Sequence, residues 1–283
     1  MTFVRRYPIA FYLVAALTIS YVVGIGVYLL SKNVQASLGT HVPYVNDLAL
    51  KFGPSLAGLL MTWVIAGRSG LRHLLRCLVK SRASVTLYLI AVLIPPATFI
   101  AALLLRNHAA DLSAINPASA LGVFAVQLAI NTFLGGGLSE ELGWRGFMTP
   151  HLAKRHTPFV ASLIVAVAWF AWHVPGYLLT NKAEADPILP FAVIVFPLSV
   201  VLTWLYYNAN ESLLLPVLLH ASLNASSYAM LILIPQVATS PTFQPVNDWV
   251  LAGIWVTLAI LVIARSGAQL GRNVAPSRED ARA

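Results

Sequence analysis

Two adjacent carboxylates and an arginine form the stretch of the sequence best equipped for chemistry. Residues 139–147 read Ser-Glu-Glu-Leu-Gly-Trp-Arg-Gly-Phe. On a helix, Glu141 and Arg145 are four residues apart and can form an ion pair on one face. Glu140 is rotated by about 100° from Glu141, so it can enter a different, desolvated environment and act as a general base. Taken alone, the stretch also fits a charge cluster that ends a helix at a membrane interface.

A histidine follows about 30 residues later in an aromatic, apolar stretch. Residues 169–175 read Trp-Phe-Ala-Trp-His-Val-Pro, which leaves His173 without a polar neighbour in the sequence. Such an imidazole can transfer protons at neutral pH. Taken alone, it fits a packed or interfacial side chain better than a catalyst.

His220 and Asn224 form the third polar group. They are four residues apart, so a helix projects both from the same face. An imidazole and a carboxamide on one stripe are hydrogen-bond donors that face the same way. The alternative is a polar contact between membrane helices, where one hydrogen bond contributes about 0.6 kcal/mol on average.

The three groups together favour catalysis over separate structural roles. Each lies in an apolar segment, where a charged side chain costs about 2.5–3.5 kcal/mol at the centre of a spanning helix. If the segments converge, Glu140, His173, His220 and Asn224 supply a base, a second proton-handling group and two donors for an oxyanion. That set is sufficient for hydrolysis by an activated water.

The three motifs, in this order, resemble those of the CAAX protease and bacteriocin-processing family of intramembrane endopeptidases, also called the Abi family. The family pattern is Glu-Glu-x-x-x-Arg, then Phe-x-x-x-His, then His-x-x-x-Asn on separate helices. The resemblance covers residues 118–228. The matching positions are Glu140-Glu141 with Arg145, Trp169 with His173, and His220 with Asn224.

One position departs from the family pattern. Trp169 stands where the family has phenylalanine, with Phe170 next to it. A bulky aromatic side chain is kept, so we expect packing to change more than chemistry. The roles that the resemblance implies are general base for Glu140 with help from His173, bracing for Glu141 and Arg145, and oxyanion binding for His220 and Asn224.

The resemblance implies a peptidase that acts on membrane-associated or prenylated CAAX-type peptides, with membrane lipid around it. No nucleic-acid partner is expected, and no protein partner is indicated. A zinc site of Glu140, His173 and His220 is the alternative to a cofactor-free glutamate mechanism. The missing His-Glu-x-x-His motif and the poor zinc ligand Asn224 favour the mechanism without metal.

Two other functions fit the same polar residues. One is a non-enzymatic membrane protein for immunity or peptide binding that uses the same cavity. The other is a small transporter or proton relay, because intramembrane glutamate and histidine also serve there. The sequence shows no internal repeat, which gives the transporter no support.

The composition sets the environment of these residues. Hydrophobic residues make up 58% of the 283 residues and charged residues 10%, with a mean hydropathy of +0.77. A soluble domain has about 25% charged residues, so soluble, coiled-coil and disordered proteins are excluded. The net charge of +8 is explained by loops that face an anionic leaflet. Cys77, the only cysteine, cannot form an internal disulfide.

Apolar segments of about 20 residues predict an all-α, multi-pass bundle in the cytoplasmic membrane. Of the 18 Lys and Arg residues, only Lys32, Lys51, Arg106 and Lys182 fall on one side, which predicts an even number of spans with both termini cytosolic. We divide the chain into N-terminal helices (1–117), a catalytic core (118–228), a last helix region (229–266) and a disordered cytosolic tail (267–283). The eight predicted spans are residues 9–30, 48–66, 85–105, 120–138, 159–179, 188–207, 213–234 and 249–264.

Overall fold

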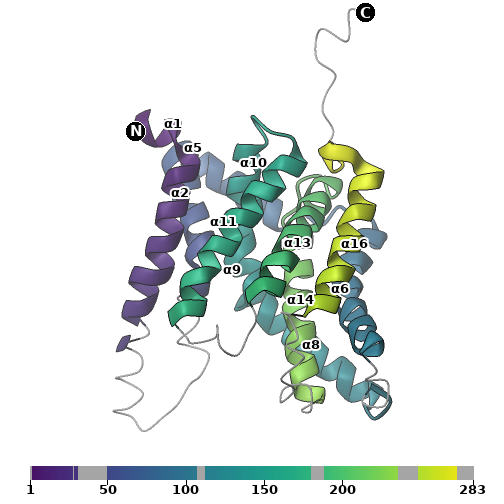
Figure 1. Ribbon diagram of the computed structural model, residues 1–283. Helices are drawn as coiled ribbons and strands as arrows, with labels where there is room; N and C mark the ends of the chain where they lie inside the picture. Colours follow the sequence, from purple (N-terminus) through teal and green to yellow (C-terminus); the bar gives the residue numbers. More distant parts are fainter. Residues whose placement is uncertain are drawn as a thin grey trace, which may run out of the picture.

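The structure, a computed structural model, describes residues 2–27, 29–30, 50–106, 112–179, 188–234 and 248–272. All regular elements within these ranges are helical, which confirms the predicted all-α bundle. Figure 1 shows the helices side by side, with the first and last elements at the same end of the bundle. In chain order the long helices are α2 (Pro8–Leu17), α5 (Gly53–Leu78), α6 (Val85–Leu105), α8 (Pro117–Phe133), α11 (Pro158–Leu179), α13 (Ile188–Asn208), α14 (Leu214–Leu233) and α16 (Trp249–Ser266).

Several short elements complete or connect these helices. Two of them are π-helical turns, and the backbone is helical on both sides of each. The short elements are α1 (Thr2–Arg6), the π-helix η1 (Thr18–Val23), α9 (Gly136–Gly143), the π-helix η2 (Trp144–Met148), α10 (Thr149–Leu152) and the 3₁₀ turn η3 (Gly267–Gln269).

Seven described helical stretches are long and apolar enough to cross a membrane. The chain is therefore a multi-pass integral membrane protein, as its composition predicts. The seven stretches are Pro8–Val27, Val85–Leu105, Pro117–Leu152, Pro158–Leu178, Ile188–Asn208, Leu214–Leu233 and Trp249–Gln269.

The predicted span at residues 48–66 accounts for the difference from eight. Residues 48 and 49 lie outside the described residues, and the apolar part of α5 ends at Gly67, where φ is 62° and ψ is −154°. Only glycine adopts such a backbone readily. Beyond it the helix becomes amphipathic, with exposed arginines on one face and Leu74 and Cys77 buried on the other. Burial raises the pKa of the Cys77 thiol.

The predicted span at residues 120–138 is interrupted just before the acidic motif. Helix α8 ends at Phe133, and Gly135 adopts an extended backbone with φ −99° and ψ −159°. The chain then re-enters helical structure at Gly136 and continues through α9, η2 and α10. The acidic motif thus lies on a short helix of its own, which a non-helical residue separates from α8.

Two helices form the centre of the bundle. In the most apolar part of α14, 72% of the residues are buried. In the most apolar part of α13, 61% of the residues are buried. The corresponding shares for the other candidate spans are 22–33%. Helix α14, which carries the third polar group, is therefore surrounded by protein on most sides, where polar side chains find partners other than lipid.

The C-terminal end of the described chain is ordered beyond the last helix. Arg272 Nη1 donates a hydrogen bond of 2.7 Å to the carbonyl oxygen of Ala153, and Asn208 Nδ2 donates one of 3.1 Å to that of Leu270. These contacts anchor the turn after α16 to α13 and to the end of α10. Residues 267–272 of the predicted disordered tail are thus ordered, and residues 273–283 lie outside the described residues.

Candidate active site

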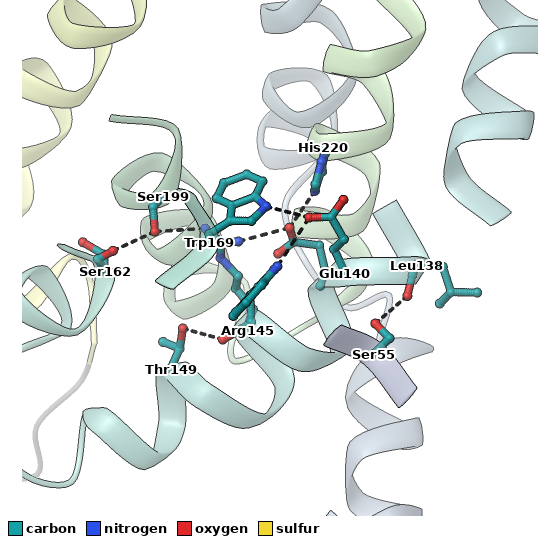
Figure 2. A network of polar contacts seen from close by, with 11 residues as sticks. Ser55, Leu138, Glu140, Arg145, Thr149, Ser162, Trp169, Ser199 and His220 are labelled. Atoms are coloured by element: carbon teal, nitrogen blue, oxygen red, sulfur yellow. Dashed lines mark hydrogen bonds and ion pairs between the residues drawn. The ribbon is translucent and has the colours of Figure 1, made fainter. Parts of the chain in front are cut away.

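The acidic motif is buried on α9, between α5 and α14. Glu140 is 5% exposed and Glu141 is fully buried, and both lie on a helix of eight residues. Helix α5 fixes this short helix through Ser55, whose hydroxyl donates a hydrogen bond of 2.8 Å to the Leu138 carbonyl oxygen (Figure 2). Two carboxylates are thus held in a protein interior, where each needs partners of its own.

Glu141 accepts hydrogen bonds from two side chains, Arg145 and His220. Arg145 Nη1 lies 3.1 Å from Glu141 Oε1, which is the ion pair that the spacing of four residues predicts. His220 Nδ1 lies 2.7 Å from the same oxygen and joins α14 to α9. A carboxylate only accepts hydrogen bonds, so the Nδ1 atom of His220 carries the proton. The opposite ring nitrogen of His220, Nε2, is left to face the interior of the site.

A hydroxyl relay holds the other end of the fully buried arginine. Arg145 Nη2 donates to Ser199 Oγ at 3.1 Å, and Ser199 in turn donates to the Ser162 carbonyl oxygen at 2.8 Å (Figure 2). Helices α13 and α11 thereby fix the guanidinium that neutralises Glu141. The bracing role of Glu141 and Arg145 stays a prediction, and these contacts place Arg145 between α9, α11 and α13.

Glu140 has a separate set of partners. Trp169 Nε1, from α11, donates a hydrogen bond of 2.6 Å to Glu140 Oε2, and Trp144 Nε1 lies 3.4 Å from the same oxygen. In the described part of the chain, no group forms a hydrogen bond with the second oxygen, Oε1. The two neighbouring glutamates therefore differ as their rotation about the helix predicts. Oε1 of Glu141 contacts Arg145 and His220 while its Oε2 is buried without a hydrogen-bond partner among the described residues, and Oε2 of Glu140 contacts two indole N–H groups.

His173 lies one turn beyond Trp169 on α11. Its Nδ1 atom is 2.9 Å from the Trp169 carbonyl oxygen, and its ring is half-buried. The imidazole packs edge-on against Trp172 and Phe191, with ring centroids 4.6 and 4.9 Å apart. Trp169 connects His173 to Glu140, because its carbonyl oxygen accepts from Nδ1 of His173 and its indole N–H donates to Glu140.

His220 and Asn224 converge on one point beside Gly136. A Cβ atom built on Gly136 would lie less than 3.0 Å from both His220 Nε2 and Asn224 Nδ2. Gly136 is also four residues before Glu140, so the two positions share one face of α9, about 5–6 Å apart. The Glu140 position therefore lies one helical turn along α9 from the point where the nitrogen atoms of His220 and Asn224 converge.

Replacing Gly136 by alanine tests this convergence. The added methyl group would occupy the space in front of both nitrogen atoms, and we expect kcat of the peptidase activity proposed below to fall about tenfold or more. Gly122→Ala is the matched control, because a Cβ at that helical position meets nothing within 4 Å. Equal turnover of both variants and the wild type, measured in liposomes, would contradict a site at Gly136.

The residues proposed for zinc are not arranged as a set of ligands. Among the described residues, no three His, Cys, Asp or Glu side chains are grouped so that they could hold one metal ion. Glu140, His173 and His220 are all among the described residues, so this finding applies to the predicted set. The three side chains therefore do not fit a His₂Glu site, and no step of the proposed chemistry passes through a metal.

Three features of the site were not predicted from the sequence. They are the indole N–H groups that donate to Glu140, the Ser199–Ser162 relay behind Arg145, and the close approach of Gly136 to α14. The expectation that Trp169 changes packing more than chemistry is incomplete, because its N–H donates to a buried carboxylate. The substitution of tryptophan for phenylalanine was the available signal, since it adds a donor.

The fold and the buried cluster define a class: a multi-pass helical membrane protein with a carboxylate–imidazole–carboxamide site between its spans. Comparison with known proteins narrows this class. Residues 122–226 match the family described as type II CAAX prenyl endopeptidase Rce1-like. The resemblance to CAAX proteases that the motifs predict is thereby confirmed for this segment.

One curated relative matches part of the same chain. It is the CAAX prenyl protease 2 of Methanococcus maripaludis, which is 28% identical over 92 residues. The match covers 30% of this chain and 34% of the relative. The chain thus aligns with about a third of that relative's length.

Proposed function

We propose that the protein is an intramembrane endopeptidase that hydrolyses a peptide bond in a membrane-associated or prenylated CAAX-type substrate. One observation carries the proposal: Glu140 lies one helical turn from the point where His220 Nε2 and Asn224 Nδ2 converge. At that separation the base can act on a water while the two donors bind the oxygen of the carbonyl group whose carbon the water attacks. The match of residues 122–226 to a CAAX endopeptidase family supports it.

Glu140 would act on the water. Its Oε1 atom accepts a proton as the water oxygen bonds to the scissile carbonyl carbon, and the carbonyl π electrons move onto oxygen. When the C–N bond breaks, the proton held by Glu140 passes to the leaving nitrogen. Overall, one water is consumed and one acid and one amine are formed. His173, which shares Trp169 with Glu140, is the second proton-handling group of this step.

His220 and Asn224 would hold the oxyanion. Asn224 donates through its Nδ2 atom, and His220 donates through Nε2 when it is doubly protonated, because Nδ1 already donates to Glu141. In that state the cluster holds two carboxylates and two cations, counting Arg145, and so balances its charge in a desolvated interior. The developing oxyanion then meets a donor set whose orientation is fixed before the reaction begins.

The substrate class follows from where this chemistry is located. The catalytic helix belongs to the candidate span Pro117–Leu152, so a peptide must reach a site that apolar helices enclose. A prenyl group would hold a C-terminal peptide at the membrane and raise its local concentration there. We therefore propose a prenylated cysteine motif as the substrate, cut so that a short C-terminal peptide is released.

A comparison of two peptides tests the proposal. Liposomes that contain the purified protein are incubated with a farnesylated peptide ending in Cys-a-a-X and with the same peptide without the lipid. We expect mass spectrometry to detect the released C-terminal tripeptide from the farnesylated peptide, at a much higher rate than from the other. Equal rates would contradict the substrate class, and no cleavage of either peptide would contradict the proposed activity.

Removal of metal ions gives a second test. Because the proposed groups are all side chains of this protein, we expect cleavage to continue at the same rate after dialysis against a strong chelator. Elemental analysis of the dialysed sample controls for metal that the chelator fails to remove. Loss of activity that returns when zinc is added would contradict a glutamate mechanism without metal.

A further inference from the structure

The Trp169 side chain contacts more members of the polar cluster than its aromatic surroundings predict. The indole is 2% exposed, and its Nε1 atom donates a hydrogen bond of 2.6 Å to Glu140 Oε2 (Figure 2). The Arg145 guanidinium carbon lies 5.0 Å from the centre of its ring. The His220 ring meets it edge-on, with centroids 5.2 Å apart. One side chain thus lies against the carboxylate, the guanidinium and the imidazole.

Both hydrogen bonds to Glu140 reach the same oxygen. Trp144 Nε1 is 3.4 Å from Oε2 and Trp169 Nε1 is 2.6 Å from it, while Oε1 has no partner within the described residues. The terminal torsion of a glutamate side chain is soft, so an unrestrained carboxylate rotates easily. Two donors on Oε2 restrict this rotation. Oε2 stays hydrogen-bonded to the indoles, and Oε1 stays free of them.

We infer that Trp169 is a positioning residue for Glu140, acting through its indole N–H. This inference rests on the proposed function of Glu140 as the base. The short bond from Trp169 fixes the carboxylate so that Oε1 stays available to a water, and the longer one from Trp144 supports it. Hydrogen bonds to an ionised acceptor are stronger than neutral ones, which makes the indole an effective restraint.

A phenylalanine at this position would keep only part of the arrangement. A phenyl ring can still lie under Arg145 and meet His220 at its edge, but it has no hydrogen to donate. The tryptophan therefore adds a restraint on Glu140 beyond packing. The shape of the Trp169 ring and its N–H group should therefore contribute separately to kcat, and variants can change one without the other.

The first measurement compares Trp169→Phe with the wild type on a peptide that the wild type cleaves. We expect kcat to fall about tenfold because the carboxylate samples unproductive orientations, while KM stays within about twofold. Trp255→Phe is the matched control. Trp255 is also fully buried, but its Nε1 atom has no hydrogen-bond partner in the described structure, and we expect unchanged kcat.

The second measurement separates the N–H group from ring size. Replacing Trp169 by 3-benzothienylalanine exchanges the N–H for sulfur and keeps the bicyclic shape. We expect the same loss of kcat as in Trp169→Phe. Full activity of this variant would overturn the inference, because packing would then explain the effect. Because the 3-benzothienylalanine variant keeps the size of the side chain, it decides the question even if Trp169→Phe does not fold.

A spectroscopic readout checks the hydrogen bond itself. The chain has seven tryptophans, so the indole N–H region of a nitrogen-15 NMR spectrum is simple enough to assign by single substitutions. We expect the Trp169 signal downfield of the others, and we expect it to move upfield in Glu140→Ala. A Trp169 signal that does not respond to Glu140→Ala would overturn the inference.

Failure of the inference and failure of the proposed function give different results. If the wild type cleaves no peptide, or if Glu140→Gln stays fully active, the proposed function fails and Glu140 is not the base. If the wild type is active, Glu140→Gln is inactive and both Trp169 variants match the wild type, the proposed function stands and the positioning role is overturned.

Discussion

Glu140→Gln is expected to lower kcat/KM for peptide cleavage by about 10²–10⁴-fold. Glutamine keeps the size of the side chain and can still accept the hydrogen bond from Trp169, but it cannot take a proton from water. The loss should therefore appear in the chemical step and not in folding. Tripeptide release from a farnesylated peptide, measured in liposomes by mass spectrometry, provides the rate.

Two controls separate chemistry from structure for this substitution. The variant should insert into membranes and melt at a temperature close to that of the wild type, because every described contact of Glu140 is retained. Glu211→Gln removes an exposed carboxylate from the turn between α13 and α14 and should leave the rate unchanged. Full turnover by Glu140→Gln would rule out the assigned base.

Asn224→Ala is expected to reduce kcat by about 10²–10³-fold with little change in KM. Its Nδ2 atom lies near Gly136 and His220 Nε2, where a donor stabilises charge that develops only in the transition state. Asn224→Asp should be slower still, because it places a negative charge where the oxyanion forms. Steady-state kinetics on the same lipidated peptide separate the two constants.

The matched control is a carboxamide that holds helices together and takes no part in the reaction. Asn208 Nδ2 donates to the carbonyl oxygens of Trp204 and Leu270, at the end of α13. Asn208→Ala should lower stability and leave kcat unchanged. An Asn224→Ala enzyme with normal kcat and a raised KM would show that Asn224 binds the substrate equally in the ground and transition states, contrary to our assignment.

Local spacing was enough to predict part of the site. The pairing of Glu141 with Arg145 depends only on helical geometry, and the structure contains it at 3.1 Å. The separate partners of Glu140 and Glu141, which are both buried, follow from their rotation about the same helix. The shared face of His220 and Asn224 has the same origin. Each of these features is set within one or two turns of a single helix.

The remaining features depend on how separate helices meet, which no local pattern encodes. The Trp169 N–H reaches Glu140 only because α11 packs with that face toward α9. Gly136 looks like part of a helix-breaking glycine run, and only the approach of α14 gives it a second role. Both features are set by tertiary packing.

The central claim is that a water activated by Glu140 attacks the peptide bond directly. The sharpest measurement is a single turnover of the farnesylated peptide by excess enzyme in ¹⁸O-enriched water, followed by mass spectrometry of the new carboxyl group. Direct attack places one ¹⁸O atom in the product during the first turnover. An unlabelled product would instead mean that the carboxylate of the enzyme formed a covalent intermediate with the substrate, and the assignment of Glu140 as a general base would be wrong.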